Sequence, residues 1–239
     1  MTYNESLKDA LNKNPFLQLS HIVYQVLKKD IITLKLKPDT KLNLTELAEQ
    51  FGTSRTPVRE ALRLLIEENF IQQQPGKKGF FVCPVPRTQI DKLFDSRKMI
   101  EGEAAYLCAL NYTNIDFSYP LYLCDQFIKM IDTKDLTDYP ENEVAFHKFF
   151  IEATNNPLFV KMYEVIETML FYHSHQIKEY WTNNPDYLVS ATGNHSLPMQ
   201  HIGICNAVVS GVPQIAQEAA INHLRSGRHY MQLYLLPQD

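Results

Sequence analysis

The second half of the sequence contains histidines and a carboxylate, side chains that commonly bind metals. Glu143 and His147 are four residues apart, so on a helix both side chains lie on one face and can reach one ion. His201 and His223 lie at similar distances on either side of the turn at residues 211–213, and antiparallel helices flanking it would let them face each other. The spacing does not establish that these residues meet. A surface hydrogen bond between Glu143 and His147 is the alternative.

The other histidines of this half are interpreted as ordinary polar side chains. His173 and His175 flank Ser174 and would point to different faces of a helix. His195 and His229 have no partner at helical spacing. None of them is expected to bind a metal.

A cluster of hydroxyl and basic side chains in the first half has the chemistry of DNA binding. The cluster comprises Ser54, Arg55, Thr56 and Arg59. On the first turn of a helix, such hydroxyls can bind phosphate oxygens, and an arginine can grip a guanine edge with two hydrogen bonds. A solvated basic helix end is the alternative. The preceding short helix, Gly52 and the basic turn at Lys77 and Lys78 favour DNA binding.

A third candidate is Arg97, which carries a guanidinium suited to pairing with a carboxylate ligand. Glu101 follows one helical turn later. An exposed salt bridge between the two side chains is therefore the competing interpretation.

The elements that position the DNA-binding cluster are short and well marked. Helical apolar spacing predicts a helix over 17–34, and Thr45 is the expected N-cap of a helix over 46–51 that ends at Gly52. The pair Thr56-Pro57 marks the start of the next helix, whose apolar face includes Val58 and Leu62. Segments 70–74 and 80–83, joined by a glycine-containing turn, read as a β-hairpin. Two helices around a turn, followed by a hairpin, are typical of a winged helix-turn-helix.

The rest of the chain is predicted to be helical. The expected helices cover 90–110, 120–134, 141–153, 158–181, 195–210 and 212–234, with a loop at 182–193. Pro84-Val85-Pro86 is a stiff connector and the expected domain boundary. The fold class is therefore mainly α, with an N-terminal winged helix-turn-helix of three helices and a small hairpin wing, and a C-terminal all-helical bundle.

Composition excludes several classes of protein. Hydrophobic residues make up 45% and charged residues 21% of the 239 residues, which is the globular range. Four scattered cysteines argue against a disulfide scaffold or a cysteine zinc site, and the absence of a signal-like or membrane-spanning segment predicts a cytoplasmic protein. Residues 21–87 carry a net charge of +4 and residues 88–239 a net charge of −8. A basic front half favours a polyanionic partner.

Residues 17–86 resemble the winged helix-turn-helix of GntR-family transcription regulators. The resemblance is carried by Leu47-Ala48, Gly52 and the run Ser54-Arg55-Thr56-Pro57-Val58-Arg59-Glu60-Ala61-Leu62. It implies that Ser54, Arg55, Thr56 and Arg59 contact DNA and that Gly76, at the tip of the wing beside Lys77, approaches the groove. Residues 1–16 are then an N-terminal extension.

Residues 87–239 resemble the FCD domain, the ligand-binding domain of the FadR subfamily. The resemblance is carried by Glu143-Val144-Ala145-Phe146-His147, by His201 through Ala207, and by His223. It implies one divalent metal per chain held by Glu143, His147, His201 and His223, with glutamate where aspartate is usual. Three imidazoles and one carboxylate suit zinc, nickel, manganese or iron. The resemblance also implies that Arg97 faces the effector cavity.

Together these resemblances imply a homodimeric repressor, not an enzyme, that binds a pseudo-palindromic operator in double-stranded DNA. A small carboxylate bound at or beside the metal is expected to relieve repression. Two alternatives use the same four side chains. One is a metal-dependent hydrolase, although no hydrolase motif accompanies the ligands. The other is a repressor that responds to the ion itself.

Overall fold

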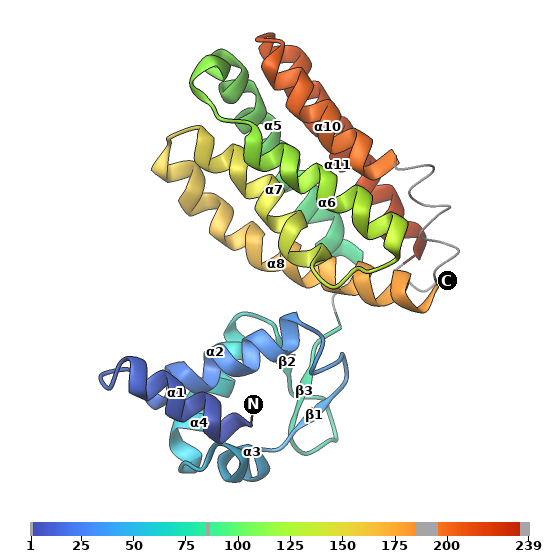
Figure 1. Cartoon of the computed structure of the whole chain (residues 1–239). Helices are drawn as coiled ribbons and strands as arrows, with labels where there is room; N and C mark the ends of the chain where they lie inside the picture. The colour runs from blue at the N-terminus through green and yellow to red at the C-terminus, as the bar shows by residue number, and fades with distance from the viewer. Residues whose placement is uncertain (1, 85–86, 185–195, 235–239) are drawn as a thin grey trace. The chain divides into compact units, whose positions relative to one another are not determined.

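The computed structural model describes residues 2–84, 87–184 and 196–234. It forms two compact units, Met1–Val85 and Pro86–Asp239, which are described separately (Figure 1). The division falls within the expected connector, of which residues 85 and 86 lie outside the described part of the chain. The expectation of a mainly α fold with a small antiparallel sheet is confirmed.

The first unit contains four helices and a small sheet within its described residues. They are α1 (Tyr3–Lys13), α2 (Leu19–Ile32), β1 (Lys41–Leu42), α3 (Leu44–Phe51), α4 (Arg55–Glu67), β2 (Ile71–Gln72) and β3 (Phe80–Val82). β3 lies between β1 and β2 and pairs antiparallel with both. The hairpin of β2 and β3 was expected, whereas β1 was not, because two residues are too short to produce a strand pattern.

Two helix starts differ from the expected ones. The N-cap of α3 is Asn43, not Thr45, since the Asn43 side chain accepts a hydrogen bond of 2.9 Å from the Thr45 backbone N–H. Helix α4 starts at Arg55 with Ser54 as its N-cap, so Pro57 is the third helical residue and not the first. Proline is tolerated there because the first four N–H groups of a helix have no partner within it. The expected end of α3 at Gly52, in the left-handed region with φ of 66°, is confirmed.

The core of the first unit fixes which face of α4 is exposed. Val58 and Leu62 are fully buried with residues of α2 and α3. The opposite face leaves Arg59 exposed. The residues predicted to be an extension include α1, whose Tyr3 ring stacks on Phe51 at 4.5 Å between centroids and whose Leu7 is buried. Helix α1 therefore packs on the helix-turn-helix itself.

The second unit consists of helices joined by short loops over its described residues. Its elements are α5 (Arg87–Leu110), a short 3-10 helix η1 (Tyr112–Asn114), α6 (Ser118–Thr133), α7 (Tyr139–Ala153), α8 (Pro157–Asn183), α10 (Ser196–Val209) and α11 (Pro213–Tyr234). They agree with the expected helices to within a few residues at each end. Of the expected loop at 182–193, residues 182 and 183 continue α8 and residues 185–193 lie outside the described residues.

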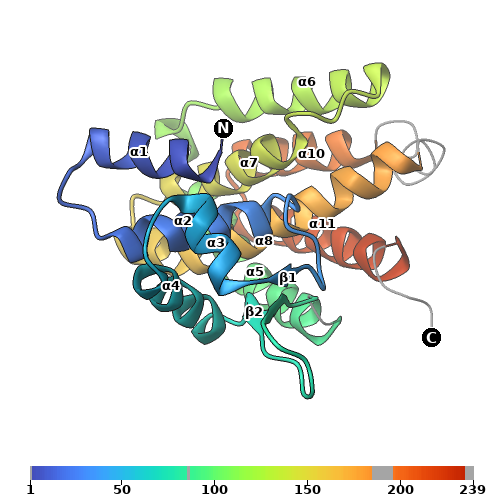
Figure 2. The same cartoon turned by 90° about the horizontal axis from the view of Figure 1, so that it is seen from below.

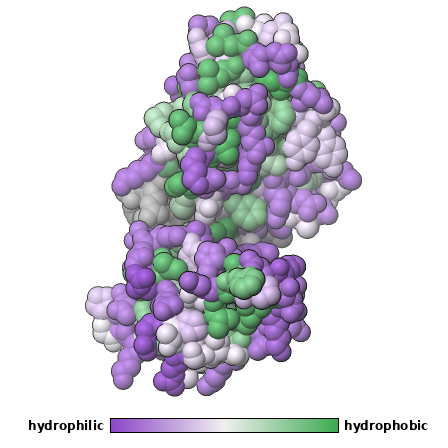
Figure 3. Space-filling view, turned by 90° about the vertical axis from the view of Figure 1, so that its left-hand side faces the viewer, coloured by the Kyte–Doolittle hydropathy of each residue, from purple (hydrophilic) through white to green (hydrophobic). Residues whose placement is uncertain are grey.

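The helices of this unit lie alongside one another as a bundle (Figures 1 and 2). α5 packs against α11 and α7, while α10 packs against α6 and α11. On the face drawn in Figure 3, hydrophobic residues form separate patches among hydrophilic ones. No helix in the described part of the chain is long and apolar enough to cross a membrane. Because these helices pack together, side chains from α5, α7, α10 and α11 meet in the interior of the bundle.

Candidate functional site

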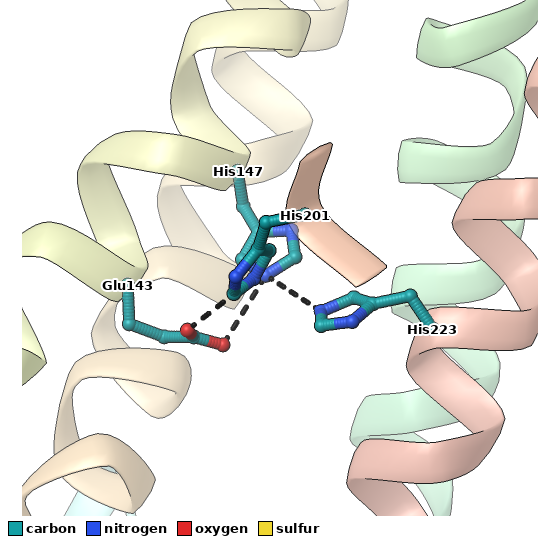
Figure 4. A group of neighbouring side chains, drawn as sticks. All are labelled: Glu143, His147, His201 and His223. Atoms are coloured by element: carbon teal, nitrogen blue, oxygen red, sulfur yellow. Dashed lines mark hydrogen bonds and ion pairs between the residues drawn. The ribbon is translucent and has the colours of Figure 1, made fainter. Parts of the chain in front are cut away.

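The structure brings the four metal-site candidates together in the interior of the second unit. Glu143 and His147 project from one face of α7, His201 from α10 and His223 from α11 (Figure 4). All four side chains are buried. Glu143 and His147 do contact each other, but inside the bundle. The alternative of a surface hydrogen bond is therefore wrong.

The nitrogen and oxygen atoms of the group converge. His147 Nε2 lies 3.2 Å from Glu143 Oε1 and 3.4 Å from His223 Nε2, and His201 Nε2 lies 3.7 Å from Glu143 Oε2. One ligand atom from each residue can be chosen so that all lie within 4.8 Å of one another. The His201 ring stacks on Phe127 and contacts the tilted ring of Phe146, with centroid distances of 4.7 and 4.3 Å.

Two of the imidazoles are oriented by partners on their other ring nitrogen. His147 Nδ1 lies 2.8 Å from Glu101 Oε2, and His223 Nδ1 lies 3.2 Å from Gln200 Oε1. Both oxygens are acceptors, so each Nδ1 donates its hydrogen outward and each Nε2 points into the group. Metal-binding histidines are commonly oriented in this way by a carboxylate or carbonyl partner.

Burial and charge set the protonation of the group. Burial lowers the pKa of His201 well below its ordinary value, and it lowers the pKa of His223 to about 3. Burial raises the pKa of Glu143, but the hydrogen bond and charge of His147 outweigh this, so the net shift is downward. Burial likewise lowers the pKa of His147 and the carboxylate of Glu101 raises it, with a net upward shift. The group therefore consists of the Glu143 carboxylate, the neutral imidazoles of His201 and His223, and the imidazole of His147, whose surroundings favour a bound proton or cation.

These residues fit a divalent transition metal. Glu143 Oε2 and both ring nitrogens of His201 are buried without a hydrogen-bond partner among the described residues. Unpaired buried polar atoms are costly, and an ion among them would satisfy those that face it. Three imidazole nitrogens and one carboxylate oxygen are the donor set of such ions.

Arg97 and Glu101 form a salt bridge, but not the exposed one that the sequence offered as an alternative. Arg97 Nε lies 2.6 Å from Glu101 Oε1 and Nη2 lies 3.2 Å from Oε2, and both side chains are buried. Burial raises the pKa of Glu101, and the charges of Arg97 and His147 bring it down to about 2. A chain of contacts therefore runs from Arg97 through Glu101 to His147.

A cavity adjoins this group. Arg97, Glu143 and His223 contribute to its lining together with side chains from α5, α8, α10 and α11. The space free of protein atoms, including its open mouth, is about 730 Å³. Its lining is mostly apolar and aromatic, with few polar groups, as in many small-molecule sites. A ligand in this cavity would lie beside two of the candidate metal ligands.

Replacing Glu101 by glutamine is expected to weaken the binding of a divalent ion by about 10- to 100-fold, the usual effect of losing an outer partner of a metal ligand. The amide keeps an oxygen near His147 but removes the negative charge that holds its Nδ1 hydrogen and balances Arg97. Titration of chelator-treated protein with zinc, followed by calorimetry, measures the change.

The matched control for this variant is Glu103→Gln. Glu103 lies on the same helix and accepts a hydrogen bond of 3.2 Å from Gln217, away from the histidines. The control is expected to bind zinc like the wild type. Equal zinc affinity of Glu101→Gln and the wild type would contradict the orienting role of Glu101.

The residues predicted to contact DNA lie at the N-terminal end of α4 and in the wing. Ser54, Arg55, Thr56 and Arg59 are all exposed. Gly76 has φ of 75°, which favours glycine, and a Cβ there would meet no atom within 4 Å. Lys77 follows it, with its Nζ 2.7 Å from Gln74 Oε1. The unit thus presents a helix end and a turn that can both reach a nucleic-acid backbone.

Three further residues lie around Glu143, His147, His201 and His223 or in the adjoining cavity without a clear signal in the sequence. The spacing of Glu101 indicates only a partner for Arg97, although its side chain also contacts His147. Gln200, which bonds His223, stands beside His201 and has no separate signal in the sequence. His173 was interpreted as ordinary, yet it is buried and lines the cavity.

Comparison with known protein families gives two matches. The family described as "Bacterial regulatory proteins, gntR family" matches residues 19–82, and the FCD domain matches residues 92–226. The second match alone covers more than half of the chain. The two matched regions lie within the first and second structural units respectively.

Individual proteins agree with these matches. The chain is 30% identical over 143 residues to the HTH-type transcriptional repressor RspR of Escherichia coli K12, covering 59% of this chain and 62% of RspR. It is 26% identical over 211 residues to the Glc operon transcriptional activator of the same strain, covering 75% of each. With the HTH-type transcriptional regulator YdhC of Bacillus subtilis it shares 36% identity over 35% of this chain and 37% of YdhC. The chain therefore spans less than two thirds of the length of RspR and of YdhC.

The fold has a counterpart among solved structures. A crystal structure of a GntR transcriptional regulator from Rhodococcus sp. RHA1 superimposes with a TM-score of 0.67 and 18% identity, covering 89% of this chain and 97% of that one. At this identity the likeness concerns the fold alone. With both domains matched in order along the sequence, the chain belongs to the GntR family of bacterial transcription regulators and carries an FCD domain.

Proposed function

We propose that this DNA-binding regulator is a homodimeric repressor whose operator affinity falls when a small carboxylate binds beside a divalent ion in the FCD domain. Glu143, His147, His201 and His223 would hold the ion. The observation that carries the proposal is their convergence in the bundle interior, where Glu143 and His223 also line the adjoining cavity.

The buried charges favour an anionic effector. Among the described residues of the second unit, the buried side chains with a permanent charge are Arg97, Glu101 and Glu143, which leave one negative charge in excess. A bound divalent ion would supply positive charge that a carboxylate oxygen can coordinate, and it would turn this excess into one positive charge. A monocarboxylate then balances the interior, where charges interact more strongly than on the surface.

Arg97 is proposed to pair with the effector. Its side chain lines the cavity, and Glu101 engages Nε and Nη2. The guanidinium has further N–H donors that can bind a carboxylate. Glu101 holds the guanidinium in place, which reduces the entropy lost when a ligand binds.

On the DNA side, Ser54, Arg55, Thr56 and Arg59 are assigned to the major groove and Gly76 and Lys77 to contacts of the wing. One helix end reads only a few base pairs. A two-fold dimer places two such ends on two half-sites, and this is the reason for proposing a homodimer on a pseudo-palindromic operator. The ion is proposed to be zinc, nickel or manganese, all of which accept imidazole and carboxylate ligands.

The test uses a labelled DNA duplex selected from a randomised pool by the full-length protein. Fluorescence anisotropy then measures its affinity for zinc-loaded and for chelator-treated protein, each with and without a panel of aliphatic, hydroxylated and aromatic carboxylates. A carboxylate that weakens DNA binding only in the zinc-loaded protein is the expected result. Zinc alone changing the affinity, with every carboxylate inert, would instead favour a metal-responsive repressor.

Lys77→Ala is expected to weaken binding to all DNA sequences by a similar factor. A lysine that neutralises a phosphate contributes through counterion release, so its loss reduces the slope of log affinity against log salt by about 1. Anisotropy titrations at several salt concentrations, on selected and on scrambled duplexes, measure both effects. A loss confined to the selected sequence would contradict a phosphate contact.

A further inference from the structure

The cavity beside the metal group contains a histidine whose role is not explained by the metal. His173 lies on α8 and has an exposed fraction of 1%. Its Nδ1 is 2.9 Å from Gln176 Oε1, while the amide nitrogen of Gln176 donates to the hydroxyl of Tyr172 at 3.3 Å. Since the Gln176 oxygen can only accept, His173 Nδ1 carries the hydrogen of the neutral ring. His173 Nε2 is therefore an acceptor.

This acceptor is buried without a partner in the described part of the chain. Burial lowers the pKa of His173 to about 4, so the ring is neutral near pH 7 and Nε2 remains an unprotonated acceptor. Buried acceptors are nearly always hydrogen-bonded, and one that lines a cavity can be satisfied by a donor on a ligand.

Ser174, the next residue, also presents a hydrogen-bond acceptor to the cavity. Ser174 is also buried and lines the cavity, and its hydroxyl donates to the backbone oxygen of Leu170 at 2.9 Å. Its one hydrogen is thus engaged, and its oxygen has only lone pairs to offer. α8 therefore presents two adjacent acceptors, which select for hydrogen-bond donors rather than for anions.

Much of the remaining cavity wall is apolar. It includes Leu93, Phe94, Leu170, Trp181, Leu224 and Met231. Removing apolar ligand surface from water against such side chains favours binding in proportion to the area buried. A very small polar anion would leave this part of the wall without contacts.

We infer that the cavity takes a carboxylate with an apolar or aromatic body and a hydroxyl or N–H donor that His173 Nε2 accepts. The anionic end rests on the proposed function, whereas the body and the donor follow from the cavity wall and from His173. Arg97 and the metal site bind the carboxylate end of the ligand. His173 and Ser174 select ligands whose body carries a hydrogen-bond donor.

The experiment compares propionate, 3-phenylpropionate and the three 3-(hydroxyphenyl)propionate isomers by calorimetry on the zinc-loaded, full-length protein. The ring is expected to improve affinity over propionate by on the order of a hundredfold through apolar burial. At least one isomer is expected to bind about tenfold more tightly than 3-phenylpropionate, because its hydroxyl satisfies a buried acceptor.

His173→Phe keeps an aromatic ring and removes the acceptor, so the gain from the hydroxyl should disappear while 3-phenylpropionate binds as before. His175→Phe is the matched control. His175 lies on the same helix, bonds the backbone oxygen of Phe171 at 3.0 Å and does not line this cavity, so the gain should persist. Zinc content and thermal midpoint check that each variant is folded. If His173→Phe does not fold, the wild-type comparison of hydroxylated and plain probes decides.

The outcomes separate this inference from the function on which it rests. If propionate and 3-phenylpropionate bind but no hydroxyl isomer improves on them, the inference is overturned and the proposed carboxylate effector stands. Persistence of the gain in His173→Phe overturns it in the same way. If none of the probes binds the zinc-loaded protein, the inference fails, and the wider carboxylate panel measured on the DNA duplex decides the proposed effector.

Discussion

Arg59→Ala is expected to lose binding to the selected DNA duplex by about 1–3 kcal/mol for each half-site, and a dimer on two half-sites incurs this loss twice. Arg59 is exposed on the first turns of α4, and its neighbour Val58 is fully buried. The substitution therefore removes a charge-assisted contact to DNA without disturbing the core. Anisotropy titration at physiological salt measures the affinity, and thermal unfolding checks that the fold is unchanged.

The control must remove one positive charge from the same unit without touching the expected interface. Lys13→Ala does so, since Lys13 ends α1 and pairs with Asp9 at 2.8 Å. It is expected to change affinity only slightly. Wild-type affinity in Arg59→Ala would show that α4 does not read DNA in the proposed way.

Purification without chelator is expected to yield about one divalent ion per chain, and both His147→Ala and His223→Ala should lose it. An ion present at a hundred times its dissociation constant stabilises the folded state by about 2.7 kcal/mol. For a protein of this size that corresponds to roughly 5–10 °C in thermal midpoint. Elemental analysis and thermal unfolding with and without EDTA measure the two effects.

His229→Ala is the matched control for the metal variants, because His229 is an exposed histidine on the same helix as His223. It should keep both the ion and the thermal midpoint of the wild type. Wild-type protein that remains free of metal after incubation with zinc, nickel and manganese would end the metal proposal, whatever the variants do.

The fold was largely predictable because local signals and core packing agree. In α4 the spacing of Val58 and Leu62 identifies the buried face, and Arg59 falls outside it. The helix starts were less accurate because several adjacent residues can act as an N-cap. Asn43 and Thr45 both have suitable side chains, and the backbone geometry at Asn43 decides between them.

The metal group was only partly predictable from local spacing. Glu143 and His147 lie on one helix, so their spacing indicates that both reach the same point. His201 and His223 come from two other helices, and only the packing of the bundle brings them to the same place. Their assignment depended on the resemblance to the FCD domain, and the structure places all four together.

The positions of Arg97 and His173 carry a signal of burial in the sequence. Arg97 stands between Leu93 and Ala104 at helical spacing, and His173 stands between Leu170 and Ile177, so both lie along stripes of apolar residues. A polar residue in such a stripe is buried by its neighbours and needs a partner. The alternative of an exposed salt bridge at Arg97 is therefore wrong, because the apolar neighbours in this stripe bury the guanidinium.

The depth of the metal group has a consequence for the speed of exchange. The four residues have exposed fractions of 7% or less, and the His201 ring stacks on Phe127 and contacts the tilted ring of Phe146. A bound ion could leave through the cavity, past Glu143 and His223, or by local opening of the bundle, and such opening is infrequent in a well-packed core. Exchange of a bound ion would then be slow, so removing it with a chelator or loading it from the buffer requires long incubation.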